Sequence, residues 1–416
     1  MPSPSIISYH DALEVIQQQA ANESGLLKSE TIEITDSLHR VTFEDILSPE
    51  QLPTFANSAM DGFSVRAFET KLASPTTPLK IPILGNLAAG DDIPQSPNEF
   101  GTWEIMTGAP FPNGFDACIR IEDIEVIKDE NEIPTHIQIT KPALPNENRR
   151  EIGEDFKSNQ VLIPRGHRVR AEDILCLTSV GVLKIEVLKK PRVGIVSTGK
   201  ELVSIHTKPE PGKIRNSSAP FLQAWLNTNF CEAIHLGTIP DDPESFKKLI
   251  LTVTSANFDL ILTTGAISMG KYDFVMTALN EIQTEFFFRK VSMRPGKPII
   301  FGRLKAGPFI IGLPGNPISG AVGLRFFVDP FLRTLQHMPV EKPLRLPLAH
   351  AVRKTPDATC FFKGRIESDS DGSRIVLHAQ QRPSLMHPLL SSTIWISMKQ
   401  NQAEVSAGSL VDVYSF

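Results

Sequence analysis

The feature that most constrains the fold is a regular alternation of apolar runs and helical stretches between residues 192 and 335. Each apolar run is too short for a helix and is typical of a buried strand. Strands that alternate with helices in this way predict a mostly parallel sheet with helices on both faces. The predicted strands cover residues 193–197, 232–239, 260–264, 299–301 and 309–311, and the predicted helices cover residues 219–228, 243–256 and 274–282.

The last predicted strand runs into the pentapeptide Leu313-Pro314-Gly315-Asn316-Pro317, which precedes a long helical pattern over residues 318–335. Asn316 is a preferred N-cap residue, and Pro317 suits the first helical position, where its missing N–H is not needed. Gly315 permits close approach of a ligand, and the helix dipole adds partial positive charge. The pentapeptide therefore predicts a site for a phosphate or another oxyanion, with an ordinary strand-to-helix turn as the alternative.

Carboxylates follow the carboxyl ends of three other predicted strands, and parallel strands present these ends at one edge of the sheet. Glu201 follows Thr198-Gly199-Lys200, Asp241 and Asp242 follow Pro240, and Asp273 ends the Gly-rich loop that begins at Gly265. Carboxylates beside a phosphate indicate a bridging Mg²⁺ ion. For Asp242 the sequence favours helix capping, and for Asp241 and Asp273 it favours a role in the site.

The turn Arg294-Pro295-Gly296-Lys297-Pro298 places two cations on a segment stiffened by proline. Fixed cations suit an oxyanion, although a surface turn with incidental charge is the alternative. With the other strand ends nearby, the sequence favours oxyanion binding.

Outside residues 189–338 the chain consists mainly of strand signals. Residues 51–145 carry short apolar runs broken by Gly, Pro and Asn turns, which predicts a small inserted β domain. Residues 339–416 show no helical periodicity and predict a C-terminal β-barrel or sandwich.

Composition excludes several classes of protein. The net charge is −5 without a Lys/Arg block, which argues against nucleic-acid binding. Four widely spaced cysteines suggest reduced thiols rather than disulfides or a zinc site. No stretch approaches the roughly 20 apolar residues of a membrane span, and no basic region precedes an apolar run at the N-terminus. The expected location is the cytoplasm.

Six short motifs, in this order along the chain, resemble the molybdopterin molybdenumtransferases, the MoeA family that includes the gephyrin E-domain. Each motif is weak alone, but the set spans nearly the whole chain. The motifs are Asn57-Ser58-Ala59-Met60-Asp61-Gly62, Met106-Thr107-Gly108-Ala109-Pro110, Gly153-Glu154-Asp155, Ser197-Thr198-Gly199, Arg294-Pro295-Gly296-Lys297-Pro298 and Leu313-Pro314-Gly315-Asn316-Pro317.

The resemblance implies a four-domain homodimer whose site lies between the α/β domain of one subunit and the β domains of the other. It implies an elongated linker domain made of residues 1–50 and 146–188, the inserted β domain at 51–145, the molybdopterin-binding α/β domain at 189–338 and the β-barrel at 339–416. The implied reaction hydrolyses adenylylated molybdopterin, releases AMP and inserts molybdate into the dithiolene, assisted by Mg²⁺.

The resemblance also implies roles for individual residues. The catalytic acidic residues would be Asp61, Asp155, Glu201, Asp241 and Asp273, of which Glu201, Asp241 and Asp273 would hold the metal. Arg294 and Lys297 would bind the oxyanion, and Arg365 with Ser384 would contact molybdate. The remaining residues expected to bind the pterin substrate are Thr107, Ser197, Thr198, Gly199, Gly265, Ser268, Gly270, Pro298, Pro314, Gly315, Asn316 and Pro317.

The chain departs from the family pattern at three positions. Lys200 and Asn216 stand where the family usually has Asp, and Ala266 replaces the second Gly of the Gly-Gly loop. The first two changes predict a more positive cleft, which would weaken metal binding and favour a polyanion. Two hypotheses follow: an active enzyme, which the retained carboxylates favour, or a non-catalytic molybdopterin-binding carrier or scaffold.

Overall fold

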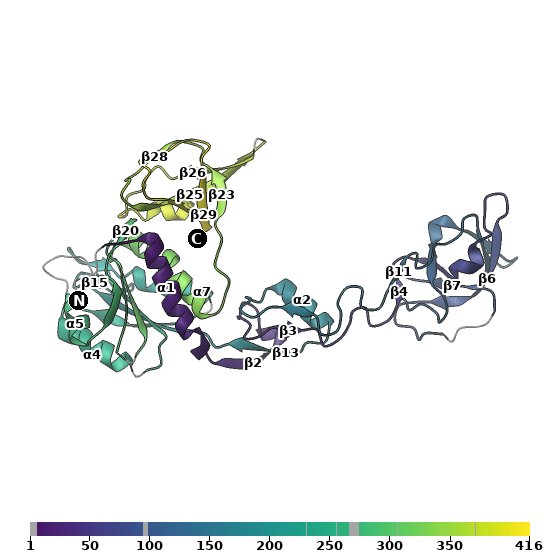
Figure 1. The fold of residues 1–416 in the computed structure, drawn as a ribbon, viewed down its shortest axis with the longest axis horizontal. Helices are drawn as coiled ribbons and strands as arrows, with labels where there is room; N and C mark the ends of the chain where they lie inside the picture. Colours follow the sequence, from purple (N-terminus) through teal and green to yellow (C-terminus); the bar gives the residue numbers. More distant parts are fainter. Residues whose placement is uncertain are drawn as a thin grey trace.

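The computed structural model describes residues 6–94, 99–229, 231–254, 256–265, 274–305, 307–370 and 372–416. The molecule is elongated (Figure 1). An α/β unit and a C-terminal β unit lie at one end, a slender segment extends from them, and a small β unit forms the other end. In the described residues, no helix combines the length and the apolar character needed to span a bilayer.

The α/β unit contains a six-stranded sheet with the order β17-β14-β18-β22-β21-β19. Neighbouring strands from β17 to β22 are parallel, and β21 is antiparallel to both of its neighbours. The prediction of a mostly parallel sheet is therefore confirmed. The strands are β14 (Arg192–Thr198), β17 (Glu232–Ile239), β18 (Leu260–Thr264), β19 (Glu285–Phe288), β21 (Ile300–Arg303) and β22 (Phe309–Leu313).

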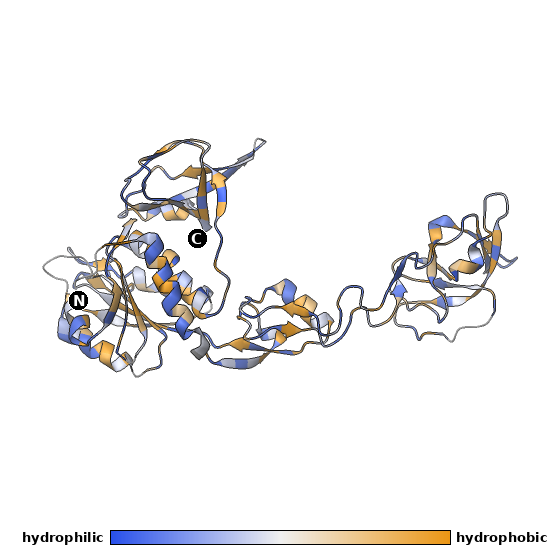
Figure 2. Ribbon diagram, in the orientation of Figure 1, coloured by the Kyte–Doolittle hydropathy of each residue, from blue (hydrophilic) through white to orange (hydrophobic). Residues whose placement is uncertain are grey.

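Helices cover both faces of this sheet because its strands are apolar on both sides. Leu260 and Leu262 face one core and Ile261 faces the other, as alternation along a strand requires. In Figure 2 the helices α1 and α4 alternate between hydrophobic and hydrophilic residues, as expected for helices with one buried side. The first core includes α1 (Tyr9–Glu23), α3 (Ser218–Thr228) and α6 (Pro317–Gly323), and the second includes α4 (Pro243–Thr254) and α5 (Phe274–Glu281).

The helical pattern after the pentapeptide is not one uninterrupted α-helix. Helix α6 continues through a π-helical segment, Leu324–Val328, into α7 (Asp329–Leu335). The change occurs beside Pro330, which has no N–H to donate to the preceding turn. The π segment carries buried Arg325, whose guanidinium donates to Asp329 Oδ2 at 2.8 Å, Glu341 Oε1 at 2.7 Å and the Ser415 carbonyl at 2.9 Å.

The C-terminal strands form a sheet that also recruits two strands from elsewhere in the chain. Its order is β1-β20-β25-β27-β29-β23, with β26 paired to β25. The predicted barrel stays a prediction, and the sheet is not built from residues after 339 alone. Its strands are β1 (Ile7–Ser8), β20 (Val291–Arg294), β23 (Leu344–Pro347), β25 (Thr359–Asp369), β26 (Gly372–Leu377), β27 (Ile394–Met398) and β29 (Leu410–Ser415).

The β unit at the far end holds a second six-stranded sheet, with the order β8-β5-β7-β6-β10-β9. The strand-rich character predicted for this region is confirmed. Its strands are β5 (Gly62–Val65), β6 (Leu79–Leu87), β7 (Thr102–Ile105), β8 (Ala117–Arg120), β9 (Glu125–Lys128) and β10 (Pro134–Ile139).

The slender segment is made by two distant stretches of chain that pair with each other. Strand β2 (Ser29–Glu33) pairs with β13 (Lys184–Leu188), and β3 (Ile46–Leu47) pairs with β12 (Val161–Ile163). The short helix α2 (Ala171–Ser179) lies beside them. The four-domain division with its exact limits stays a prediction.

Candidate functional site

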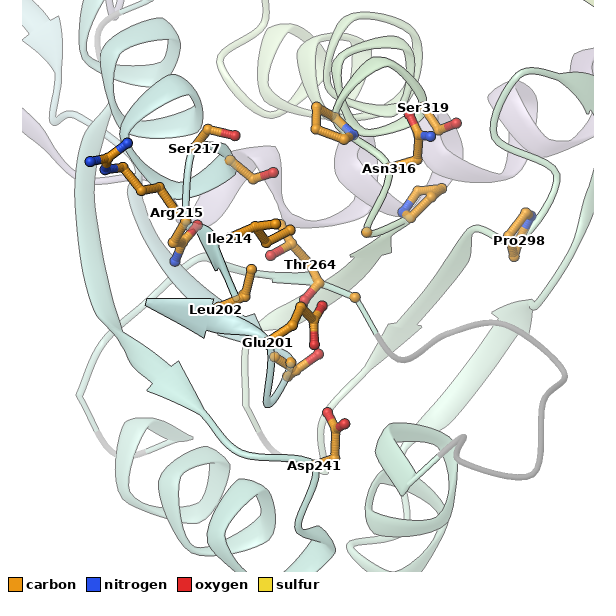
Figure 3. Close-up of a pocket in the computed structure, with 18 residues that line it drawn as sticks. Glu201, Leu202, Ile214, Arg215, Ser217, Asp241, Thr264, Pro298, Asn316 and Ser319 are labelled. Atoms are coloured by element: carbon orange, nitrogen blue, oxygen red, sulfur yellow. The ribbon is translucent and has the colours of Figure 1, made fainter. Parts of the chain in front are cut away.

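The carboxyl ends of β14, β17, β18 and β22 border one cleft of about 520 Å³, which we call the first cleft. Figure 3 shows Asn316 and Ser319 at one side of this cleft, Arg215 and Ser217 at another, and Glu201 between them. The strand ends therefore meet as the parallel sheet predicts. Its lining residues are Thr198, Gly199, Glu201, Leu202, Ile214, Arg215, Asn216, Ser217, Ser218, Asp241, Thr264, Gly265, Pro298, Pro314, Gly315, Asn316, Pro317 and Ser319.

The pentapeptide forms the predicted strand-to-helix turn. Strand β22 ends at Leu313 and α6 begins at Pro317. The Asn316 side chain accepts a hydrogen bond from the Ile318 N–H at 3.2 Å. The N-cap and the proline at the first helical position are therefore confirmed, and four residues of the turn line the cleft.

Glycines let the strand ends approach each other closely. Gly265 has a φ of +90°, and a Cβ atom there would lie 2.5 Å from the Thr198 carbonyl oxygen. A Cβ atom on Gly315 would lie 3.2 Å from Gly265 Cα. The Thr198 hydroxyl donates to the Thr264 carbonyl at 2.9 Å and joins the same two strand ends. Larger residues at these positions would close the floor of the cleft.

Two of the predicted metal-binding carboxylates line the first cleft. Glu201 curls over Gly199, where a Cβ atom would lie 2.6 Å from Glu201 Oε1, and Asp241 extends from the end of β17. Their hard oxygen ligands fit Mg²⁺ when substrate phosphate oxygens complete the coordination. The predicted residues Ser268, Gly270 and Asp273, together with Ala266, lie outside the described residues.

Protein ligands alone do not complete a metal site in the described part of this cleft. Within the residues that the structure describes, three His, Cys, Asp or Glu ligand atoms approach one another within 4.8 Å only at His10, Asp11 and Glu14, on the exposed side of α1. Asp242 caps α4, because its carboxylate accepts from the Ser245 N–H at 2.8 Å. Hydrogen bonds from Ser245 also lower the pKa of Asp242. The sequence prediction that Asp242 is a cap is confirmed.

A small flap covers one side of the first cleft. It consists of β15 (Leu202–Val203) and β16 (Ile214–Arg215), which pair in parallel. Arg215 lines the cleft, whereas Lys200 is exposed and does not. Sequence reasoning did not single out Arg215, whose Nε donates to the Thr207 carbonyl at 3.2 Å, because nothing in the sequence shows which way a loop side chain turns.

Asn216 is a scaffold residue as well as a lining residue. Its side chain is 5% exposed, its amide donates to Thr238 Oγ1 at 3.0 Å, and its oxygen accepts from the Ala219 N–H at 3.2 Å. The second bond gives a partner to a backbone N–H in the first turn of α3. Both bonds give a structural reason for an amide at a position where the family usually has Asp.

A second cleft of about 520 Å³ lies between the Arg294–Pro298 turn and β25 of the C-terminal sheet. The predicted oxyanion residues Arg294 and Lys297 line this second cleft and not the first, and Pro298 and Ser319 line both. Arg353 and Lys354 add two cations that the sequence analysis did not single out. The sequence around Arg353 and Lys354 does not show that these two side chains lie beside the Arg294–Pro298 turn.

Several predicted residues lie elsewhere. Asp61 and Thr107 belong to the far β unit, beside β4 (Asn57–Ser58) and the end of β7. Asp61 Oδ1 accepts from the Thr107 N–H at 2.7 Å and from its hydroxyl at 2.8 Å, and these bonds lower the pKa of Asp61. Asp155 lies in the connection between the slender segment and β11 (Arg149–Arg150), where its N–H donates to the Leu52 carbonyl at 2.9 Å.

The remaining three predicted residues line neither cleft. Ser197 is fully buried behind the first cleft, and its hydroxyl has no hydrogen-bond partner in the described structure. Arg365 is exposed on β25 and pairs with Glu367. Ser384 is exposed in the loop after β26. Their roles in binding stay predictions.

Two regions of the chain match known protein families. Residues 7–181 match the family described as MoeA N-terminal region (domain I and II), and residues 194–334 match the family described as probable molybdopterin binding domain. A molybdopterin molybdenumtransferase of Synechococcus elongatus is 35% identical over 414 residues, which cover 99% of this chain and 100% of the relative. One of Haemophilus influenzae is 31% identical over 400 residues, with 94% of each chain covered.

Solved structures show the same fold. The crystal structure of a molybdopterin biosynthesis MoeA protein from Pyrococcus horikoshii superimposes with a TM-score of 0.82 at 22% identity, covering 99% of this chain and 100% of that chain. Another from the same organism gives a TM-score of 0.77 at 27% identity, with 99% of both chains covered.

Proposed function

Because the chain belongs to the family of molybdopterin molybdenumtransferases, we propose that it is an enzyme of molybdenum cofactor biosynthesis. It hydrolyses adenylylated molybdopterin, releases AMP and inserts molybdate into the dithiolene. The observation that carries this proposal is the first cleft, where Glu201 and Asp241 lie opposite the Pro314–Pro317 turn. Carboxylates facing a turn suited to anions form a site for a metal-bridged phosphate.

The first cleft would hold the phosphate groups of the substrate. The amino ends of α3 and of the helical run that starts with α6 both border it, and both carry partial positive charge. Glu201, Asp241 and the predicted ligand Asp273 would hold Mg²⁺. The ion, when bound, supplies charge that offsets the negative charge of the pyrophosphate. Arg215 adds a cation of the protein itself.

The second cleft would hold molybdate between fixed cations. Arg294 and Lys297 stand on a turn with two prolines, so their backbone is stiff. Insertion is a substitution at molybdenum without a change of oxidation state. The two thiol groups of the dithiolene bind molybdenum, and one oxo group leaves as water with the two thiol protons.

We also propose that the site is completed by a second copy of the chain. The predicted acidic residue Asp61 lies between β4 and β5, and Asp155 follows β11. Figure 1 shows β4 and β11 at the far β unit, away from the α/β unit whose strand ends border the first cleft. The slender segment also exposes an apolar cross-strand pair, Leu47 at 47% and Val161 at 49% exposure, which suits an interface between copies. The described cysteines are free, which supports a cytoplasmic location.

The test is to incubate the purified protein with adenylylated molybdopterin, Mg²⁺ and molybdate, and to follow AMP release and cofactor formation. The matched variant is Lys200→Asp, which restores the residue usual in the family. Because Lys200 is exposed and does not line the cleft, we expect both proteins to release AMP at rates within about threefold of each other.

The outcomes separate the two hypotheses. Tight pterin binding without AMP release would refute the enzyme hypothesis and leave only the carrier or scaffold. Absence of pterin binding would refute both hypotheses. Activity confined to the Lys200→Asp variant would show that charge at this position decides turnover.

A further inference from the structure

The slender segment contacts the α/β unit through a turn at residues 164–167, which packs against the end of α7. We call this contact the joint. Gly166 has a φ of +74°, and a Cβ atom there would lie 2.1 Å from the His337 carbonyl oxygen. Two residues later, the Arg168 guanidinium donates to the Thr228 carbonyl at the end of α3, at 2.9 Å. Backbone of the slender segment therefore lies directly on the α/β unit.

His337 occupies the position just after the C-cap of α7. Its φ is +58°, a conformation that glycine adopts without strain and that a histidine resists. The half-buried imidazole contacts Arg165 of the turn and Ser24 at the end of α1. A side chain held on a strained backbone at a contact between two units is a candidate for a functional role.

A single ring nitrogen of His337 lies between a donor and an acceptor. Its Nε2 is 2.6 Å from Arg165 Nη2 and 3.1 Å from the Ser24 carbonyl oxygen. A guanidinium can only donate a hydrogen bond, and a carbonyl can only accept one. The protonation state of Nε2 therefore decides which of the two neighbours His337 binds.

The two protonation states have opposite effects on the joint. Neutral His337 with its proton on Nδ1 accepts from Arg165 and ties the slender segment to α7. Protonated His337 donates to Ser24, which belongs to its own unit, and its charge repels Arg165. Burial and the Arg165 charge lower the pKa of His337, whereas the Ser24 contact raises it. A lowered pKa means that the bond to Arg165 is present at neutral pH and is lost as the pH falls through that pKa.

Arg165 is held in place from its own side of the joint. Its guanidinium lies 5.8 Å from the centre of the Phe43 ring, and its backbone N–H donates to Asp45 Oδ1 at 2.7 Å. Among the described residues, no carboxylate pairs with the side chain of Arg165 or of His337. The other charged groups around the joint have partners of their own, which are Glu23 with Arg303, His167 with Asp173, and Arg333 with the Pro339 carbonyl.

We propose that His337 is a proton-operated latch, which holds the slender segment against the α/β unit when neutral and releases the turn at residues 164–167 when protonated. Arg168 keeps its bond to the Thr228 carbonyl in both states, because neither group titrates in this range. Release therefore changes the angle at the joint without separating the units. The slender segment carries the far β unit, so this change moves Asp61 relative to the α/β unit (Figure 1).

The test follows the angle at the joint in the full-length protein as the pH changes. A fluorescent donor and acceptor are attached to Cys176, the exposed native cysteine on α2, and to a second thiol introduced on α4 by Lys248→Cys. Labelled protein is diluted into unlabelled protein, so that energy transfer occurs within one chain. Histidine NMR titration gives the pKa of His337, whose signal is identified by its absence from His337→Gln.

The matched variants remove either the proton or the cation. His337→Gln keeps an acceptor but cannot gain charge, and Arg165→Gln removes the group that the proton repels. The control is His10→Gln, because the His10 side chain is 80% exposed on α1. Circular dichroism over the same pH range checks that each protein stays folded.

We expect energy transfer in the native protein to be constant between about pH 8 and about pH 7 and to change in a one-proton step as the pH falls toward about 5. The midpoint should equal the pKa of His337 measured by NMR. His10→Gln should keep the step, and His337→Gln should lose it. Arg165→Gln should also lose it, and the pKa of His337 should rise toward its ordinary value.

Three results would overturn the latch: no step in the native protein, a step that persists in His337→Gln, or a midpoint that differs from the pKa of His337. If His337→Gln does not fold, the native midpoint and the Arg165→Gln variant decide the question. AMP release is not part of this test, so failure of the latch leaves the proposed function standing.

Discussion

The Gly265→Ala substitution tests whether the floor of the first cleft depends on contact between the ends of β14 and β18. Gly265 has a φ of +90°, a conformation that costs an L-residue about 1–3 kcal/mol. Its new Cβ atom would also lie 2.5 Å from the Thr198 carbonyl oxygen and 2.8 Å from Thr198 Oγ1. Relieving such overlap costs about 1–3 kcal/mol more, because β14 must move.

The control is Gly212→Ala, which measures the cost of a positive φ for alanine without any steric overlap. Gly212 has a φ of +82°, but a Cβ atom there would meet nothing within 4 Å. Both glycines belong to the α/β unit, so the difference between the two variants measures the contact with Thr198. We expect Gly265→Ala to be less stable than Gly212→Ala by about 1–3 kcal/mol.

Scanning calorimetry is the assay. The transition of the α/β unit is identified as the one that AMP and Mg²⁺ raise, since a ligand stabilises the unit that binds it. At roughly 2–4 °C per kcal/mol for units of about 150–250 residues, the transition of Gly265→Ala should lie about 2–12 °C below that of Gly212→Ala. Equal transitions for the two variants would refute the argument that close approach of these strand ends shapes the cleft.

Two further predictions concern single hydrogen-bonding groups. Thr107→Ala removes the hydroxyl bond to Asp61 and keeps the backbone bond, so the lowered pKa of Asp61 should rise toward its ordinary value. Carboxyl NMR titration checks this, with Thr107→Ser as the control that keeps the low pKa. A lowered pKa means that the stabilisation is present at neutral pH and is lost as the pH falls through that pKa, so the loss should begin at higher pH in Thr107→Ala. Asn216→Asp keeps an acceptor for α3, and the Thr238 hydroxyl can turn to donate, so the free energy of unfolding should change by less than about 1 kcal/mol. Asn216→Ala loses both bonds and should cost about 1–3 kcal/mol by calorimetry, and equal losses in the two variants would contradict this account.

The sequence alone determined the elements whose information is local. The strand predicted at residues 260–264 has the same bounds as β18. A short apolar run that is flanked by turn-forming residues is typical of a buried strand. The Asn316 cap and the Pro317 start of α6 followed from the conformational limits of those two residues. The meeting of the strand ends in one cleft followed from parallel topology.

Tertiary structure decided what depends on contacts between distant parts of the chain. The strand β20 lies within the α/β stretch of the sequence, yet it pairs with β1 and β25 of the C-terminal sheet. That pairing carries Arg294 and Lys297 away from the first cleft and into the second. Likewise, only the folded flap shows that Arg215 rather than Lys200 lines the first cleft. Local sequence fixes backbone conformation, whereas the direction of a loop side chain is set by packing against residues that lie far away in the sequence.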